Sequence, residues 1–305
     1  MIKNIPQDIE FEQLALDCIT KSFEMLYSIG WDYKNLATDV NEEDYWKHND
    51  ITVRTSLIVL FQGVEYLMKM KITEKSALLL IENNRTDWST IPGKRDKNFD
   101  ELITISGENL LSVFCAITDE NFKLAEFAPK FEELRKKRNK LVHSTGVNGL
   151  DYKYIIKEIL SILSIFYFDE KWIELLREKF VSEPTFGHWD SDVELASYHQ
   201  TLDFVEHSLN KAEINKYIPY DIKSRRYFCP YCTHWLSKEE EAEAKWAFLN
   251  PNTADSKKIH CLVCDKEHDV TRDQCQPEDP EDECKGNVLS NEYIDKQCLT
   301  CYSQE

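Results

Sequence analysis

Residues 138 to 143, Arg-Asn-Lys-Leu-Val-His, place a fixed cation, a carboxamide and an imidazole within six positions of the chain. The guanidinium of Arg138 can hold phosphate oxygens and does not lose its proton. The imidazole of His143 can take up or release a proton near neutral pH. Asn139 and His143 are four residues apart, so on a helix they share one face and can meet one ligand. Together these side chains could cleave a phosphodiester bond without a metal ion.

The helix that carries this motif is expected over residues 120 to 143, with Gly146 favouring a helix end close by. Its apolar positions include Phe131, Leu134 and Leu141. Arg138 falls on this stripe, where a guanidinium is costly unless something pairs with it. Because Arg138 and His143 are five residues apart, they point about 140° away from each other on an ideal helix. Their convergence requires the reach of arginine, a helix end near His143, or a second subunit.

A carboxylate interrupts a second expected helix, residues 51 to 70, in the same way. Glu65 lies on its apolar stripe, which is formed by Ile58, Phe61 and Met68. A carboxylate at such a position needs a partner. The simplest pairing joins Glu65 to Arg138 or Arg135. A purely structural interpretation follows, in which Arg138 forms a core ion pair and His143 lies near the carbonyls of a helix end.

Five cations occupy the six positions from Arg135 to Lys140 in a protein that is otherwise acidic. The chain has 37 Lys and Arg against 55 Asp and Glu, a net charge of −18, which argues against a coating mode of nucleic-acid binding. A local basic run still favours phosphate contacts. The predicted substrate-binding residues are Arg135, Lys136, Lys137 and Lys140. The alternative is a solvated helix face.

These features resemble the HEPN superfamily, whose mark is an arginine followed after four to six residues by a histidine. Here the pair is Arg138 and His143, with the polar Asn139 directly after the arginine. The segment from Leu57 to Lys69 is similar to the other core helix of that family, which often carries a glutamate followed four residues later by a lysine. In this chain Glu65 and Lys69 have that spacing. The resemblance covers roughly residues 5 to 180 in pattern.

The resemblance implies a specific activity. Active members of the family are metal-independent endoribonucleases that work as dimers, in which two motifs meet across a helix-pair interface to form one composite site. The implied catalytic residues are Arg138, Asn139, His143 and Glu65. Many members are toxins or act in defence against phage, which implies RNA, a second copy and a protein partner or antitoxin as partners. Other members are non-catalytic adaptors or RNA-binding scaffolds.

The cysteines predict metal sites in the C-terminal region. Two of the ten, Cys18 and Cys115, lie in helical apolar contexts and are assigned no role. The other eight form two sets of four, namely Cys229, Cys232, Cys261 and Cys264, then Cys275, Cys284, Cys298 and Cys301. The paired C-x-x-C spacing of the first set is a strong signal for structural zinc, and the second set is looser. We expect two zinc ions per chain, bound sequentially, and no cofactor for catalysis.

Three alternatives remain open for these cysteines. The two sets could be cross-braced, with alternating pairs sharing each ion. A histidine could replace a cysteine, the candidates being His234, His260 and His268. The looser set could also be free thiols, because disulfides are rare in the cytosol.

The expected fold is mainly α. A HEPN-like helical bundle over residues 1 to 218 would be followed by a small cysteine-rich zinc-binding domain with short β-hairpins, residues 219 to 305, that resembles zinc ribbons. The expected helices are 8 to 29, 51 to 70, 120 to 143, 150 to 167, 169 to 180 and 192 to 217. Residues 82 to 100 are expected to form an exposed loop. The sequence Ser237-Lys-Glu-Glu240 predicts a further helix through Leu249.

No secretory signal or long apolar run is evident, so a cytoplasmic protein without a membrane segment is expected. The favoured function is a metal-independent endoribonuclease that cleaves RNA by 2′-hydroxyl attack, as a toxin or anti-phage effector. The alternatives are a non-catalytic adaptor or RNA-binding scaffold with a zinc interaction module, and a zinc-dependent regulator whose helical part only dimerises.

Overall fold

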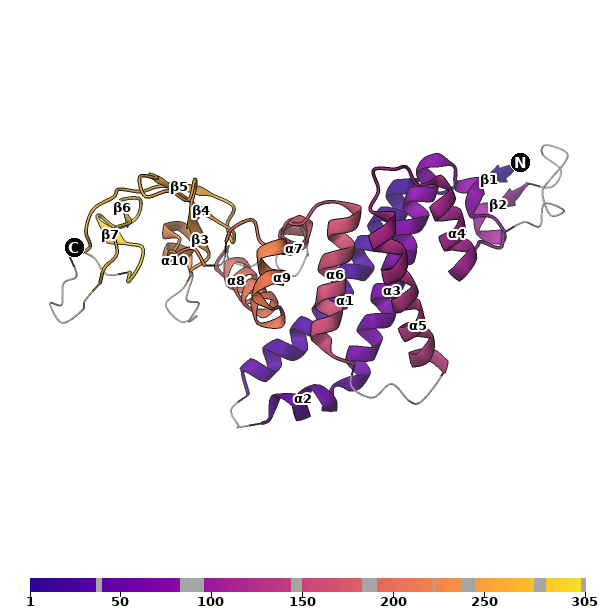
Figure 1. Cartoon of the computed structure of the whole chain (residues 1–305), viewed down its shortest axis with the longest axis horizontal. Coiled ribbons are helices and arrows are strands. Elements are labelled where there is room, and N and C mark those ends of the chain that lie inside the picture. Colours follow the sequence, from indigo (N-terminus) through magenta and orange to yellow (C-terminus); the bar gives the residue numbers. More distant parts are fainter. Residues whose placement is uncertain are drawn as a thin grey trace. The chain divides into compact units, whose positions relative to one another are not determined.

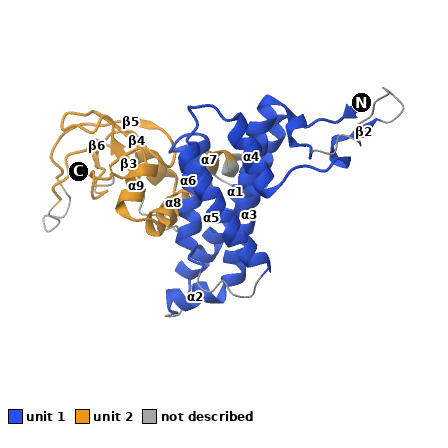
Figure 2. Ribbon diagram, turned by 45° about the vertical axis from the view of Figure 1, so that its right-hand side comes forward, with its two compact units in different colours: residues 1–172 blue, residues 173–305 orange. Residues whose placement is uncertain are grey.

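The computed structural model describes residues 1–36, 40–82, 96–143, 150–182, 191–221, 223–236, 245–276 and 284–302. The chain is mainly helical and ends in a region of short antiparallel strands with two cysteine clusters, as the sequence predicts (Figure 1). It divides into two compact units, residues 1–172 and 173–305 (Figure 2).

Unit 1 is built mainly from helices. Its elements are β1 (Ile2–Lys3), α1 (Asp8–Lys34), α2 (Glu42–His48), α3 (Asp50–Lys75), η1 (Ala77–Leu80), β2 (Lys97–Asn98), η3 (Phe99–Glu101), α4 (Gly107–Ile117), α5 (Leu124–His143) and α6 (Tyr152–Phe166). The short strands β1 and β2 pair in parallel. The predicted helices over α1, α3, α5 and α6 are therefore confirmed, whereas α2 and α4 were not predicted.

The long helices α1 and α3 pack side by side and form the centre of unit 1 (Figure 2). Gly63 lies at their contact, because a Cβ atom there would sit 2.9 Å from Ile19 Cγ1 and 3.1 Å from the Ala15 carbonyl oxygen. The lack of a side chain at Gly63 thus lets the two backbones approach closely. The surrounding core side chains are fully buried, among them Ile19, Leu26, Leu57, Leu60 and Leu67.

The helices α5 and α6 complete the core against α3. The rings of Phe61 in α3 and Phe131 in α5 are stacked, with centroids 5.4 Å apart. Phe127 meets Phe166 of α6 edge to face at 5.2 Å. Aromatic pairs of this kind contribute stability beyond their buried area, and they fix α5 along its length.

One described helix, α3, is long and apolar enough to cross a membrane. Its apolar side chains pack on α1, α4, α5 and α6 within unit 1. This burial accounts for the composition of α3 as that of a core helix.

Unit 2 contains four helices and five short strands in its described residues. These are α7, which begins in unit 1 (Lys171–Ser182), α8 (Ser191–Ser208), α9 (Lys211–Tyr217), α10 (Pro230–Trp235), β3 (Ala247–Leu249), β4 (Lys258–Cys261), β5 (Glu267–Asp269), β6 (Leu289–Ser290) and β7 (Gln297–Cys298). Strands β3, β4 and β5 form an antiparallel sheet in that order, and β6 and β7 form a separate antiparallel pair.

Most of α7 and all of α8 and α9 belong with the cysteine-rich region rather than with the helical unit in which the sequence had placed them. The Trp246 indole donates a hydrogen bond to Asp203 of α8 over 2.9 Å. Arg226 forms a two-point ion pair with Glu206 of the same helix. Arg177 of α7 donates to the Leu262 carbonyl over 2.6 Å. The structure therefore divides between Trp172 and Ile173, whereas the predicted boundary follows residue 218.

Two local expectations differ from the structure. The predicted helix through Leu249 is wrong at its end, because residues 247–249 form β3; residues 237–244 lie outside the described residues. Buried Trp246 and Phe248 explain the strand, which pairs with β4. In the predicted loop 82 to 100, residues 97–101 form β2 and η3, and residues 83–95 lie outside the described part of the chain.

Replacing Gly63 with valine should lower the free energy of unfolding of the protein by about 1–3 kcal/mol, because the added methyl groups overlap Ile19 and the α1 backbone. Urea unfolding followed by circular dichroism at 222 nm measures the change. The matched control is Gln62→Val, which introduces the same β-branched residue at the neighbouring, partly exposed position of α3. Equal effects of the two substitutions would show that close packing at Gly63 is unimportant.

Candidate functional site: the end of helix α5 and two cysteine tetrads

Helix α5 ends at His143, as the position of Gly146 favours. The His143 side chain is exposed and has no hydrogen bond or ion pair among the described residues. Arg138 is partly buried, and its guanidinium carbon lies 5.5 Å from the centroid of the Phe61 ring in α3. One of its nitrogens, Nη1, donates a hydrogen bond of 3.0 Å to Asn139 Oδ1. Arg138 is thus held by an aromatic face and a neighbouring carboxamide.

The expected pairing of Glu65 with Arg138 or Arg135 is wrong. Glu65 is partly buried in α3 and makes no hydrogen bond or ion pair within the described part of the chain. Arg138 lies instead over Phe61, one helical turn before Glu65. The guanidinium of Arg135 is held by Glu108 of α4 and by Glu132, each at 2.9 Å. The structural interpretation of Arg138 as half of a core ion pair therefore fails.

The basic run of α5 separates into two groups. Arg135 and Lys137 are engaged with carboxylates, the latter with Glu133 at 3.4 Å, and Lys137 also lies over the Tyr154 ring. Lys136 and Lys140 are exposed, and Lys136 has no partner among the described residues. Arg135 and Lys137 are thus engaged within the fold, whereas the exposed Lys136 fits both the solvated-face alternative and contact with an added anion.

The first four cysteines converge. The sulfur atoms of Cys229, Cys232, Cys261 and Cys264 all lie within 4.8 Å of one another. Cys229 also caps α10, because its sulfur accepts a hydrogen bond from the Cys232 backbone N–H over 3.5 Å. Cys261 ends strand β4, and Cys264 follows in the turn before β5. The turn that begins α10 and the turn that follows β4 therefore each supply two sulfurs to one candidate metal site.

The last four cysteines form a second tetrad with the same spread of sulfur positions. Its members are Cys275, Cys284, Cys298 and Cys301. Gly286 supports it, because its N–H donates to Cys284 Sγ over 3.3 Å and a Cβ at this position would lie 2.7 Å from Cys298 Sγ. The sequential assignment of the cysteines is thus confirmed, and the cross-braced arrangement is excluded.

The nearby histidines do not replace a sulfur in either tetrad. His268 is buried, with Nε2 3.3 Å from Cys229 Sγ and Nδ1 2.8 Å from Glu292 Oε2. Burial lowers the pKa of His268, but its hydrogen bonds to Cys229, Cys264 and Glu292 raise that pKa to about 10. An imidazolium donating toward sulfur offsets thiolate charge at a metal site. His260 instead bonds to Tyr220 and Asp265, and His234 stacks on Tyr293.

Both tetrads have the chemistry of structural metal sites. Four sulfurs close a tetrahedral shell and leave no position for a reactive water molecule. The eight sulfurs come from separate segments that carry only short strands, so a metal ion bound in each tetrad would contribute directly to folding. These sites therefore support the architecture of the C-terminal region rather than a metal-catalysed reaction.

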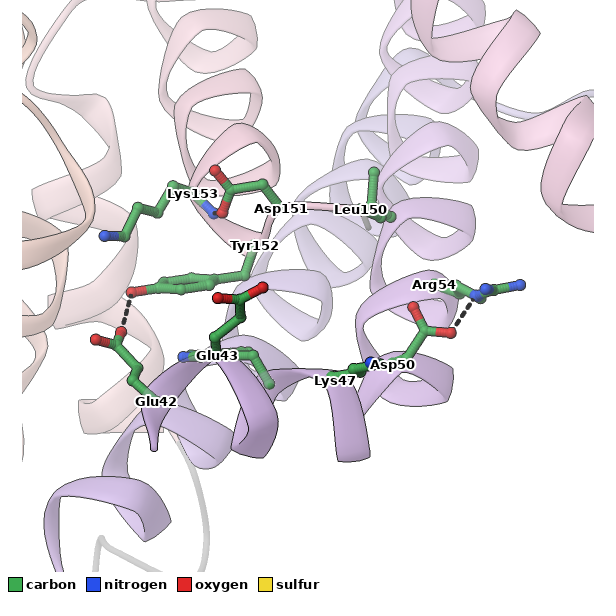
Figure 3. A pocket seen from close by; sticks show the side chains of 10 residues that line it. Glu42, Glu43, Lys47, Asp50, Arg54, Leu150, Asp151, Tyr152 and Lys153 are labelled. Atoms are coloured by element: carbon green, nitrogen blue, oxygen red, sulfur yellow. Dashed lines mark hydrogen bonds and ion pairs between the residues drawn. The ribbon is translucent and has the colours of Figure 1, made fainter. Parts of the chain in front are cut away.

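A pocket of about 780 Å³ lies beside the first turns of α3 and α6 (Figure 3). Its charged walls are partly paired with one another, since Arg54 forms an ion pair with Asp50 and the Tyr152 hydroxyl donates to Glu42. None of the predicted site residues lines it. The pocket lining therefore does not include Arg138, Asn139 or His143 at the end of α5.

Two contributing residues escaped the sequence argument. Phe61 was recognised only as part of an apolar stripe, although the guanidinium of Arg138 lies over its ring. Glu292 had no sequence signal, because its bond to His268 depends on a contact between strand β5 and the loop between β6 and β7. No protein-family model, no curated protein and no solved structure matches the chain.

The purified protein is expected to hold two metal ions per chain, measured by inductively coupled plasma mass spectrometry. Cys261→Ser and Cys298→Ser should each lower the ratio to about one, because each removes a sulfur from a different closed shell. Cys18→Ser is the control and should keep both ions. Loss of both ions from either tetrad variant, with the helical circular dichroism signal unchanged, would contradict two independent sites.

Proposed function

We propose that the protein is a metal-independent endoribonuclease of the HEPN type, with Arg138, Asn139 and His143 as its catalytic residues. The observation that supports this most is the state of the motif at the end of α5. Arg138 has no ion pair with a carboxylate in the described residues, and His143 is exposed. Neither side chain forms an ion pair among the described residues, so both can contact a phosphodiester.

The proposed reaction needs only these groups and the RNA. The 2′-oxygen attacks the adjacent phosphorus, and the bond from phosphorus to the 5′-oxygen breaks. The imidazole of His143 takes the proton of the 2′-hydroxyl and then returns it to the leaving 5′-oxygen. Arg138 stabilises the charge on the phosphorane oxygens. The products are a 2′,3′-cyclic phosphate and a 5′-hydroxyl, and DNA is not cleaved because it lacks the nucleophile.

A composite site in a dimer brings the arginine of one copy to the imidazole of the other. Arg138 and His143 point about 140° apart on one helix, and Arg138 leans on Phe61. Two motifs facing each other would place an arginine of one copy beside His143 of the other. Val142, next to the histidine, is 49% exposed, so this part of α5 is open to contact with a second copy.

We also propose that both tetrads bind Zn²⁺. Four thiolates in a compact set are the ligands that structural zinc prefers, whereas magnesium and calcium prefer oxygen. In this proposal the zinc ions hold the C-terminal region together and take no part in cleavage. Ribonuclease activity should therefore persist in a chelator that leaves both tetrads loaded.

The test is an RNA cleavage assay with the full-length, zinc-loaded protein in EDTA. His143→Ala should slow cleavage by about 100-fold or more, because a positioned acid or base contributes about 10²–10⁴-fold to such reactions. Arg138→Ala should have a similar effect through lost charge stabilisation. The products should carry a cyclic phosphate, which mass spectrometry detects.

The matched control is His207→Ala, which removes another exposed histidine at a helix end and should leave the rate unchanged. Circular dichroism and metal content confirm that each variant is folded. Equal cleavage by wild type and both motif variants would contradict the proposal. RNA left intact by all of them would favour the non-catalytic scaffold.

A further inference from the structure

Four aromatic side chains lie close together at α10. Tyr231, His234 and Trp235 come from α10, and Tyr293 comes from the loop between β6 and β7 (Figure 1). The His234 and Tyr293 rings are stacked, with centroids 4.3 Å apart and planes at 16°. Trp235 meets His234 edge to face at 5.3 Å, and Tyr231 lies 6.5 Å from Tyr293. We call these four residues the aromatic platform.

The platform is open to solvent. Trp235 is 43% exposed and Tyr293 is 40% exposed, and His234 is exposed as well. Among the described residues of unit 2, Trp235 and Tyr293 are the only large hydrophobic side chains that are exposed. The other side chains of this kind lie in unit 1. Exposed aromatic surface that is concentrated at one place marks a binding surface.

The first tetrad and its hydrogen-bonded neighbours hold the platform in place. The Cys229 and Cys232 turn fixes α10, with Cys232 and Leu236 buried. The loop that carries Tyr293 is tied to the first tetrad by the bond from His268 to Glu292. The same loop is closed by a hydrogen bond from the Lys296 N–H to Asn291 Oδ1. The rings are therefore preorganised, so a planar ligand loses little free energy in ordering them.

The charge around the platform suits an anionic ligand. Lys266 Nζ lies 3.2 Å from the centroid of the Tyr231 ring. The carboxylates that directly flank Lys266 and Tyr293 are engaged elsewhere. Asp265 bonds to Arg177 and His260, Glu267 to Lys258, and Glu292 to His268. A cation thus lies over the Tyr231 ring of the platform, and the carboxylates on either side of it, Asp265 and Glu267, are paired with Arg177 and Lys258.

We propose that the aromatic platform binds unpaired bases of single-stranded RNA by stacking, with Lys266 contacting a phosphate. This inference rests on the proposed function, because it supplies the substrate-holding surface for the ribonuclease. Every nucleobase offers a planar face to an aromatic ring, and single-stranded RNA is recognised in this way. A protein partner fits less well, since the platform lacks the aliphatic side chains that would accompany a buried apolar contact.

The test measures binding of a fluorescein-labelled oligouridylate to the full-length, zinc-loaded protein by fluorescence anisotropy. All proteins carry His143→Ala, so the probe is not cleaved. Adding Trp235→Ala and Tyr293→Ala should raise Kd about fivefold or more, because each base stacked on an aromatic ring contributes about 1–3 kcal/mol. Trp235→Phe should retain most of the affinity. Phe168→Ala, which removes a 48% exposed aromatic ring of unit 1, is the matched control and should change nothing.

Stacking predicts two further results. The deoxy form of the probe should lose affinity in the same double variant, and a blunt RNA duplex should bind weakly, because its bases are already stacked. An unchanged Kd in the double variant, or a duplex that binds as tightly as the single strand, would contradict the proposal that the platform binds single-stranded RNA by stacking. Loss of self-association in the double variant with unchanged RNA affinity would overturn it in favour of a contact between copies.

The two proposals fail separately. Weaker RNA binding in the double variant together with intact RNA in the wild-type cleavage assay supports the platform and contradicts the ribonuclease. Cleavage that depends on His143, with RNA affinity independent of Trp235 and Tyr293, supports the ribonuclease and contradicts the platform.

Discussion

The packing of α5 on α3 is the interaction on which the proposed catalytic site depends. Phe61 stacks on Phe131 and also lies beneath the guanidinium of Arg138, so a single ring of α3 contacts α5 at two positions two helical turns apart and holds its arginine. With α5 held in this way, the helical pitch sends His143 to a different side of the same helix. One chain thus presents the two groups apart. A second copy is the simplest source of the missing partner, and this makes dimerisation part of the proposed mechanism.

The C-terminal region depends on a different constraint. Its strands are short and its cysteines come from separate segments, so bound metal would contribute to the folding free energy. The bond between His268 and Glu292 joins the first tetrad to the loop of the second. That bond also positions Tyr293 beside α10. In our account, metal binding therefore stabilises the fold and prepares a surface for RNA at the same time, while the cleavage chemistry stays in unit 1.

Local sequence patterns predicted the parts of this structure that local physics controls. The apolar periodicity located α1, α3, α5 and α6, and the C-x-x-C spacing identified the first tetrad. The second tetrad followed from elimination, because four cysteines remained. Contacts between distant segments were beyond such patterns. Nothing in the sequence showed that Arg138 would lie over the ring of Phe61 and would not pair with the carboxylate of Glu65. Nor did the sequence show that Asp203 of α8 would accept a hydrogen bond from Trp246. The strand at residues 247–249 was missed for the same reason, since its partner is β4.

The most direct test of the central claim is complementation between two inactive variants. Arg138→Ala and His143→Ala chains, each with a different affinity tag, are co-expressed, and the mixed dimer is purified through both tags. A composite site needs the arginine of one copy and the histidine of the other, so we predict that the mixed dimer cleaves RNA while neither parent homodimer does. A mixed dimer as inactive as its parents, or a protein that stays monomeric at assay concentration, would contradict a site shared between two copies.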